Sequence, residues 1–154
     1  MTLELNSPAF DDGQTLPRRY AHGGDNLSPP LHWSGAPEGT RSFALVVEDP
    51  DAPKGTFRHW AIYDLPGDKQ DLPEAAGRVG QPGARQGVND FGEARYDGPQ
   101  PPKGHGPHHY HFKLLALGID RLETPHSPRV ADVIEAARPH VLAVAEMIGV
   151  YENC

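Results

Sequence analysis

The chain contains one cysteine among its 154 residues, and that cysteine is the last residue, Cys154. An intrachain disulfide framework and a cysteine-based zinc site are therefore excluded. The first residues include no apolar stretch of signal-peptide length, and no segment approaches the roughly 20 apolar residues of a transmembrane helix. We therefore expect a cytoplasmic protein without membrane insertion.

Basic runs are also absent. Lys and Arg number 14 against 21 Asp and Glu, which gives a formal net charge of −7. Contacts to nucleic acid phosphates need clustered Lys and Arg, so nucleic acid is not an expected partner. A local anion site is still compatible with this charge, because such a site depends on a few groups only.

Apolar residues make up only 37% of the chain, because 17 Gly and 17 Pro occupy much of it. These residues separate clear apolar runs, which indicates turns rather than disorder. At this length, and without a break in composition, we expect one domain over residues 1–154.

Three strong apolar runs and two weaker ones predict strands. The strong runs cover residues 43–47, 59–65 and 110–117, and the weak runs cover residues 3–5 and 31–33. The stretch from 66 to 106 is rich in Gly and Pro and is too long for a simple loop. We expect a short strand or helix inside it, around residues 87–90.

The C-terminal part has the only helical pattern. Its apolar residues recur close to the helical period at positions 130, 133, 134, 137, 141, 144, 145 and 148. Ser127 can cap the helix, Pro128 suits its first turn and Gly149 can end it. Pro139 interrupts the pattern, so we expect two short helices. Strands followed by helices indicate a mostly β fold, a sandwich or barrel with helical additions.

Ionisable residues stand at the ends of the three strong strands. Asp49 and Asp51 follow the first strand, His59 opens the second, and His108 precedes the third. If the first strand runs antiparallel to the other two, these side chains meet at one edge of the sheet.

Alternation in the third strand separates its histidines. His108 continues the apolar face of Tyr110 and Phe112 to the rim of the sheet, whereas His109 and His111 share the opposite face. A histidine at the mouth of an apolar pocket can carry a tunable charge.

Two Pro-rich loops accompany these positions. The two prolines of DPDAP fix their own φ, and each also restricts the residue before it, so we expect this pattern to stiffen the loop and to hold the carboxylates of Asp49 and Asp51 in fixed directions. In PPKGHG, Pro101 and Pro102 stiffen the loop, while Gly104 allows a ligand oxygen to approach free N–H groups closely.

Five stretches together resemble a known family. In order they read DNLSPPLHW, DPDAP, GTFRHWAIYDLP, NDFG and YDGPQPPKGHGPHHYHF. They resemble the phosphatidylethanolamine-binding proteins (PEBP), and within them the bacterial and archaeal Raf-kinase-inhibitor-like branch. The resemblance extends over residues 6–151, nearly the whole chain.

This resemblance implies a PEBP-like β-sandwich of antiparallel sheets with short C-terminal helices, and a pocket at a sheet edge that binds phosphate or a similar anion. Carried over to this sequence, the ligand-binding residues are Asp49, Asp51, His59, Pro101, Pro102, Gly104, His108 and Tyr110. The C-terminal helix with a pocket tyrosine that eukaryotic members carry has no clear counterpart here, so Tyr151 is not given that role.

Our main hypothesis is a binding module without catalytic residues or a cofactor. Its ligand would be phosphate or a phosphorylated or zwitterionic small molecule, with His59 and His108 donating hydrogen bonds and Asp49 orienting one imidazole. The resemblance also permits modulation of a protein kinase or protease through the pocket, and a homodimer.

The alternative from the enzyme class is a metal-dependent hydrolase. His109 and His111 form a plausible ligand pair on one strand face, and His105 from the loop could complete an open site. Lys113 on the same face argues against this alternative, because its charge would repel a metal ion.

Overall fold

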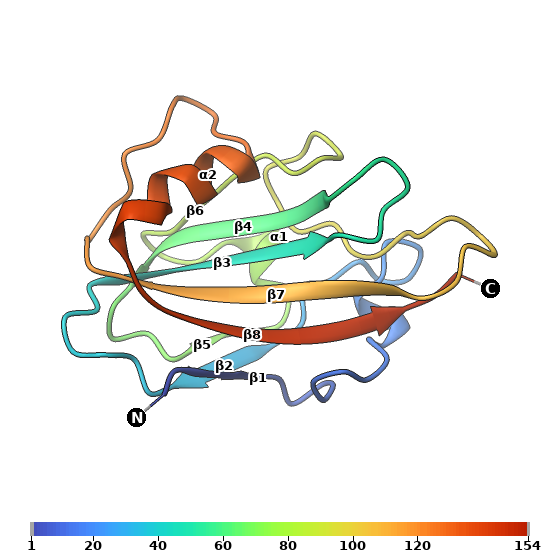
Figure 1. The fold of residues 1–154 in the computed structure, drawn as a ribbon, viewed down its shortest axis with the longest axis horizontal. Coiled ribbons are helices and arrows are strands. Elements are labelled where there is room, and N and C mark those ends of the chain that lie inside the picture. The colour runs from blue at the N-terminus through green and yellow to red at the C-terminus, as the bar shows by residue number, and fades with distance from the viewer. Residues whose placement is uncertain (1, 154) are drawn as a thin grey trace.

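Two antiparallel sheets form the frame of the molecule in this computed structural model, which describes residues 2–153 (Figure 1). The larger sheet has the strand order β6-β4-β3-β7-β8, and the smaller has the order β1-β2-β5. The strands are β1 (Glu4–Asn6), β2 (Leu31–Ser34), β3 (Ser42–Asp49), β4 (Phe57–Pro66), β5 (Asp71–Leu72), β6 (Arg85–Gln86), β7 (His108–Leu117) and β8 (Val141–Tyr151). The helices are α1 (Ala76–Val79) and α2 (Val130–Ala137), with 3₁₀ turns at Arg18–Tyr20 and Arg138–His140. The predicted fold class, a mostly β sandwich of antiparallel sheets, is confirmed.

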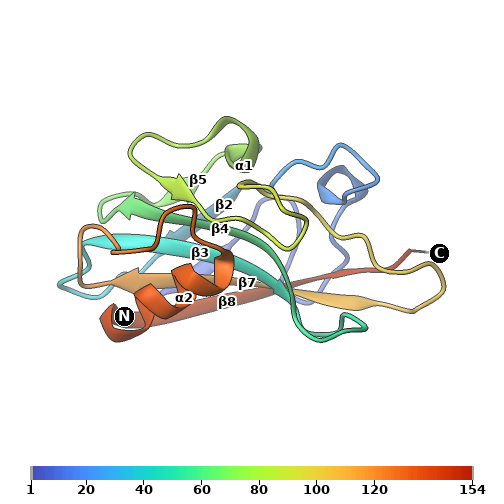
Figure 2. The same cartoon turned by 90° about the horizontal axis from the view of Figure 1, so that it is seen from above.

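Strand β3 lies at the centre of the larger sheet, and all its residues are buried. One face, with Phe43 and Leu45, belongs to the core between the two sheets. The other face, with Ala44 and Val46, belongs to a second core under α2, which covers the outer side of the sheet (Figure 2). Burial on both faces explains why this strand has a continuous apolar sequence rather than an alternating one.

Helix α2 confirms the first of the two predicted C-terminal helices, but it begins at Val130, after the expected cap at Ser127 and the expected first turn at Pro128. Ser127 has a positive φ of 49°, which is outside the helical region. The Asp132 carboxylate instead accepts the Arg129 N–H at 2.9 Å. This bond satisfies a donor that the helix start leaves free.

The second predicted helix is wrong. Residues from Val141 onward form β8, which pairs with β7 along its whole length. Ala145 and Met147 are buried, whereas Leu142 and Val144 are 48% and 52% exposed and Glu146 is also exposed, so the burial follows the period of a strand. In sequence, residues 141–148 are apolar at every position except Glu146, so a helical spacing and a strand alternation can both be found in them. Pairing with the long edge of β7 decides in favour of the strand.

The stretch from 66 to 106 contains β5, α1 and β6, so the expected hidden elements exist but lie earlier than predicted. Around residues 87–90 the chain forms only an isolated bridge, between Val88 and Arg129. Among the described residues, no helix has the length and apolar character needed to cross a membrane.

The strand assignment of β8 predicts unequal costs for two substitutions. Met147→Ala should lower the free energy of unfolding by about 2 kcal/mol or more, because it leaves a cavity in the core between the sheets. Val144→Ala should cost less than about 0.5 kcal/mol, since this side chain faces solvent. Urea unfolding measures both values, and a larger cost at Val144 would contradict the strand.

Candidate functional site

A cavity of about 240 Å³ opens where β3 ends and where β4 and β7 begin. Both neighbours of β3 are antiparallel to it, with Asp49 opposite Phe57 on β4 and Glu48 opposite His111 on β7. The predicted meeting of the three strand ends is therefore confirmed. The residues that line the cavity are Asp49, Ala52, Pro53, Phe57, His59, Phe91, Gln100, Pro101, Pro102, His108 and Tyr110.

Six of the eight sequence-predicted site residues line this cavity, and two do not. The six are Asp49, His59, Pro101, Pro102, His108 and Tyr110. Asp51 lies outside, on the surface, where its Oδ2 accepts hydrogen bonds from both the backbone N–H and the Nδ1 of His109, each at 2.8 Å. Burial opposes its charge, but these bonds outweigh that effect and lower the pKa of the Asp51 carboxyl. Asp51 thus ties its loop to the start of β7.

Gly104 also lies away from the cavity wall. Its N–H donates to the Asn153 carbonyl at 3.0 Å, and the N–H of His105 donates to the Pro102 carbonyl at 3.0 Å. The expected free N–H groups of this loop are therefore occupied at these two positions. Gly104 has a φ of +74° and would place a Cβ in open space, so its backbone conformation, rather than close packing, calls for glycine.

His108 lies in a chain of three side chains. Its Nδ1 is 2.6 Å from Oδ2 of the buried Asp49, and its Nε2 is 2.6 Å from Nδ1 of His105 on the exposed loop. Asp49 also accepts the N–H of Asp51 on its Oδ1 at 2.8 Å. The Asp49 carboxylate fixes the His108 ring, and both ring nitrogens are engaged.

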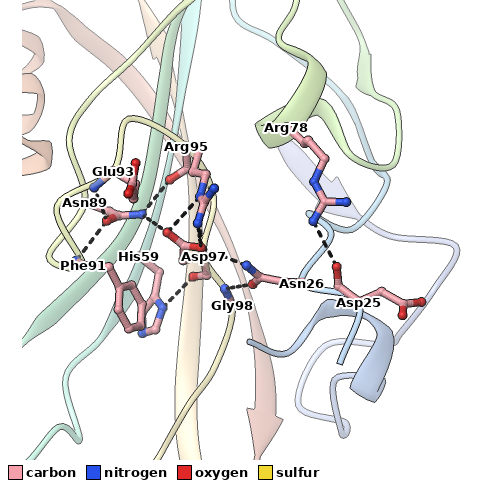
Figure 3. Close-up of polar contacts among 10 residues, drawn as sticks. All are labelled: Asp25, Asn26, His59, Arg78, Asn89, Phe91, Glu93, Arg95, Asp97 and Gly98. Carbon is pink, nitrogen blue, oxygen red and sulfur yellow. Dashed lines mark hydrogen bonds and ion pairs between the residues drawn. The ribbon is translucent and has the colours of Figure 1, made fainter. Parts of the chain in front are cut away.

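His59 is fixed in a different way. Its Nδ1 is 2.8 Å from the backbone carbonyl of Asp97, which can only accept, so Nδ1 carries the hydrogen (Figure 3). Burial lowers the pKa of this imidazole, although the Asp97 carbonyl and the Asp49 carboxylate act in the opposite direction. The ring is therefore neutral at pH 7, and Nε2, which has no hydrogen bond within residues 2–153, is an acceptor at the cavity.

Aromatic rings surround the two imidazoles. The ring of Phe57 lies 4.9 Å from that of His59 and 4.8 Å from that of Phe91, and the Tyr110 ring lies 5.3 Å from that of His59. Burial, together with the Asp49 carboxylate, raises the pKa of the Tyr110 hydroxyl, which stays protonated. The lining residues that were not among the predicted site residues are Ala52, Pro53, Phe57, Phe91 and Gln100. Phe91 belongs to NDFG, a stretch noted only for its resemblance to the family.

The histidines of the hydrolase alternative do not converge. His109 contacts Asp51, and His111 lies on the same outer face 3.3 Å from Glu146, while His105 contacts His108. Within residues 2–153, no group of three or more His, Cys, Asp or Glu side chains is arranged to hold a metal ion. The structure therefore gives the hydrolase reading no support.

The profile of one family, "Phosphatidylethanolamine-binding protein", matches residues 6–152. This chain belongs to that family. The UPF0098 protein of Aquifex aeolicus is 42% identical over 98% of this chain and 89% of its own length. YbcL of Escherichia coli is 45% identical over 84% of this chain and 73% of its own length.

Solved structures agree with this assignment. A crystal structure of Escherichia coli YbcL, described as a member of the mammalian PEBP family, covers 100% of both chains at a TM-score of 0.95 and 38% identity. A putative PEBP homologue from Chlamydia trachomatis covers 99% of both chains at a TM-score of 0.88 and 35% identity. A carboxypeptidase Y inhibitor, solved with its cognate proteinase, covers 99% of this PEBP-family chain and 83% of its own at a TM-score of 0.61 and 20% identity, a likeness of fold alone.

The buried neutral His59 predicts a loss of stability on acidification. Its pKa in the fold lies below the ordinary value of 6.5, so its contribution is complete above about pH 6.5 and decreases as the pH falls toward the folded value. The expected slope from this one group is at most about 1.4 kcal/mol per pH unit. Chemical denaturation between pH 7.5 and 5 should show a shallower decline in His59→Gln than in the native protein, and equal slopes would contradict the assignment.

Proposed function

We propose that this PEBP-family protein binds a small molecule bearing a phosphate or a similar anion in the cavity at the end of β3. The observation that carries the proposal is a pair of buried imidazoles, His59 and His108, which reach one cavity from the two strands flanking β3. Imidazole can supply both an N–H donor and a positive charge near neutral pH.

His59 is the first contact for the anion. Its Nε2 is an acceptor in the ligand-free protein, so binding requires a proton there. A monoprotonated phosphate brings this proton itself, whereas a fully ionised anion requires the ring to take one up from solvent. Both routes end in a charge-assisted hydrogen bond between Nε2 and a ligand oxygen.

The Asp49 carboxylate is compatible with an anion in this cavity because its two oxygens are already engaged. Oδ1 accepts the Asp51 N–H and Oδ2 contacts His108, so the ligand meets the far side of an imidazole. His108 can donate to the ligand from Nε2 only when the ring is protonated and that atom has separated from His105, because Nδ1 already donates to Asp49. In this proposal, Asp49 is a group that orients His108.

The size and wall of the cavity favour a ligand larger than phosphate alone. A volume of about 240 Å³ equals about eight water molecules at their liquid volume. The half-buried rings of Phe57 and Phe91 offer an aromatic surface, which attracts an ammonium group or packs against methylene groups. A zwitterion such as phosphoethanolamine matches both parts.

A phosphorylated side chain of a partner protein carries the same phosphate group, and an acidic side chain carries a similar anion. Modulation of a kinase or protease through this cavity therefore stays a prediction, to be tested by a pull-down that depends on His59 and His108. Homodimer formation and a cytoplasmic location likewise stay predictions.

Calorimetry with sulfate and phosphoethanolamine tests the proposal. Sulfate keeps its charge between pH 6 and 8, so its affinity should rise toward pH 6 by up to about tenfold per pH unit as His59 takes up a proton. His59→Gln should weaken sulfate binding at pH 6 and flatten this dependence, whereas His111→Gln on the outer face of β7 should change neither. Equal affinities in the native protein and His59→Gln would reject the cavity as the binding site.

The contact between His105 and His108 predicts a gain of affinity when His105 is removed. His105→Ala frees the Nε2 of His108, and a hydrogen bond of about 1 kcal/mol no longer competes with the ligand, so phosphoethanolamine should bind about fivefold more tightly. His109→Ala, outside the cavity, is the matched control in the same titration. Weaker binding by His105→Ala would instead make this loop histidine a ligand contact.

A further inference from the structure

The backbone of Asp97 contacts His59 at two points. Its carbonyl accepts the Nδ1 hydrogen of the imidazole at 2.8 Å, and its N–H lies 3.4 Å from the carbonyl of the same histidine. Asp97 itself belongs to no strand or helix, since it lies in the irregular segment between β6 and β7. Regular pairing in a sheet therefore does not hold the peptide that sets the tautomer of His59.

The Asp97 carboxylate is 1% exposed and collects donors from three side chains (Figure 3). Asn26 Nδ2 donates to Oδ1 at 2.8 Å, Asn89 Nδ2 to Oδ2 at 2.9 Å, and Arg95 Nε lies 3.2 Å from Oδ1. Burial opposes the charge, but these three donors outweigh it and lower the pKa of the carboxyl. This carboxylate is therefore ionised and fully paired inside the protein.

Each amide partner also holds a second part of the site. Asn26 Oδ1 accepts the N–H of Gly98 at 2.7 Å, directly after Asp97. Asn89 Oδ1 accepts the N–H groups of Phe91 at 2.9 Å and of Glu93 at 3.1 Å, which fixes the turn that carries the Phe91 ring. That ring lies 5.6 Å from the ring of His59.

We propose that Asp97 is the positioning residue of the cavity: its carboxylate, clasped by Asn26, Asn89 and Arg95, holds its own carbonyl against His59 and so keeps Nε2 open to the ligand. The consequence for binding rests on the proposed function, but the effect on His59 does not. This role accounts for three of the stretches that resemble the family, DNLSPP, NDFG and YDGP, whose polar residues Asn26, Asn89 and Asp97 meet here.

Asp97→Asn tests the contacts of the Asp97 carboxylate with Asn26, Asn89 and Arg95. The two amide donors and Arg95 all require acceptors, and an asparagine offers them one oxygen in place of two. Two other ties stay in place, from the His22 N–H to the Pro99 carbonyl at 2.9 Å and from the Tyr96 hydroxyl to the Tyr20 carbonyl at 2.7 Å. The segment therefore keeps its attachment to residues 20–22 in this variant.

Asp64→Asn is the matched control. The Asp64 side chain is also completely buried and paired with an arginine, Arg85, at 2.7 Å, and it accepts the Leu122 N–H at 2.9 Å. It lies toward the opposite end of β4, away from the cavity. Replacing a buried carboxylate by an uncharged amide should lower the stability of both variants. A change in the tautomer of His59 should appear in Asp97→Asn only.

The experiment reads the tautomer and the titration of His59 by long-range ¹H–¹⁵N correlation spectra of ligand-free, ¹⁵N-histidine-labelled protein, with His59→Gln to assign the signal. In the native protein and in Asp64→Asn, Nδ1 of His59 should be protonated and Nε2 unprotonated. Asp97→Asn should show a mixture of the two tautomers and a changed titration midpoint for His59. The other carboxylates that act on His59, those of Asp49 and Asp90, are unchanged in these variants.

Sulfate binding at pH 6 adds the functional readout, with a loss of at least about fivefold expected in Asp97→Asn and none in Asp64→Asn. A native tautomer in folded Asp97→Asn would overturn the inference. If that variant does not fold, Asn26→Gly replaces it, because glycine keeps the positive φ of 56° without strain. This change removes one donor to the Asp97 carboxylate and the acceptor of the Gly98 N–H, and an unchanged tautomer there would likewise overturn the inference. If the tautomer shifts but sulfate binds to no variant, the proposed function fails and the positioning role stands.

Discussion

The antiparallel pairing of β3 with both β4 and β7 is the constraint on which the cavity depends. Because both neighbours run opposite to β3, the residues that follow β3 and those that open the flanking strands lie at one end of the sheet. Asp49 and His108 are 59 positions apart in sequence, yet their side chains are 2.6 Å apart. A parallel arrangement of either neighbour would place one histidine at the opposite end of the sheet.

The two imidazoles are held by acceptors of different charge. His108 faces a carboxylate, whereas His59 faces a backbone carbonyl, so a neutral ring satisfies the second partner completely. Burial then keeps His59 uncharged in the absence of a ligand, and a bound anion would favour its protonation. The cavity accordingly stores no unpaired positive charge in the absence of a ligand, which would be costly inside a protein.

The sequence predicted those parts of the structure that follow from local patterns. The alternation from His108 to Ala116 correctly separated the buried face of β7 from the outer face with His109 and His111. The same reasoning failed for residues 141–148, because they are apolar at every position except Glu146 and the sequence alone does not select one period. Pairing with β7 decides in favour of the strand.

Within the site, residues aligned with strand ends were easier to predict than residues on loops. His59 and His108 continue buried strand faces, so their approach to a common cavity could be inferred. Asp51 and Phe91 lie on irregular chain, and their positions depend on particular hydrogen bonds. Asp51 accepts the N–H of His109, which is far away in sequence, and the Phe91 N–H donates to the side chain of Asn89, which is itself bound to the Asp97 carboxylate. No periodicity in the sequence encodes such bonds.

Two chain segments near the cavity, one with Gly98 and one with Gly106, differ in how freely they can move. A Cβ at Gly98, next to Asp97, would lie 2.0 Å from the Tyr20 carbonyl oxygen, so backbone is in direct contact with backbone there and little displacement is available. A Cβ at Gly106, beside His105, would meet nothing within 4 Å. The loop with Gly106 can therefore move to fit ligands of different shape. The segment with Gly98 cannot, and it keeps the position of the His59 imidazole constant.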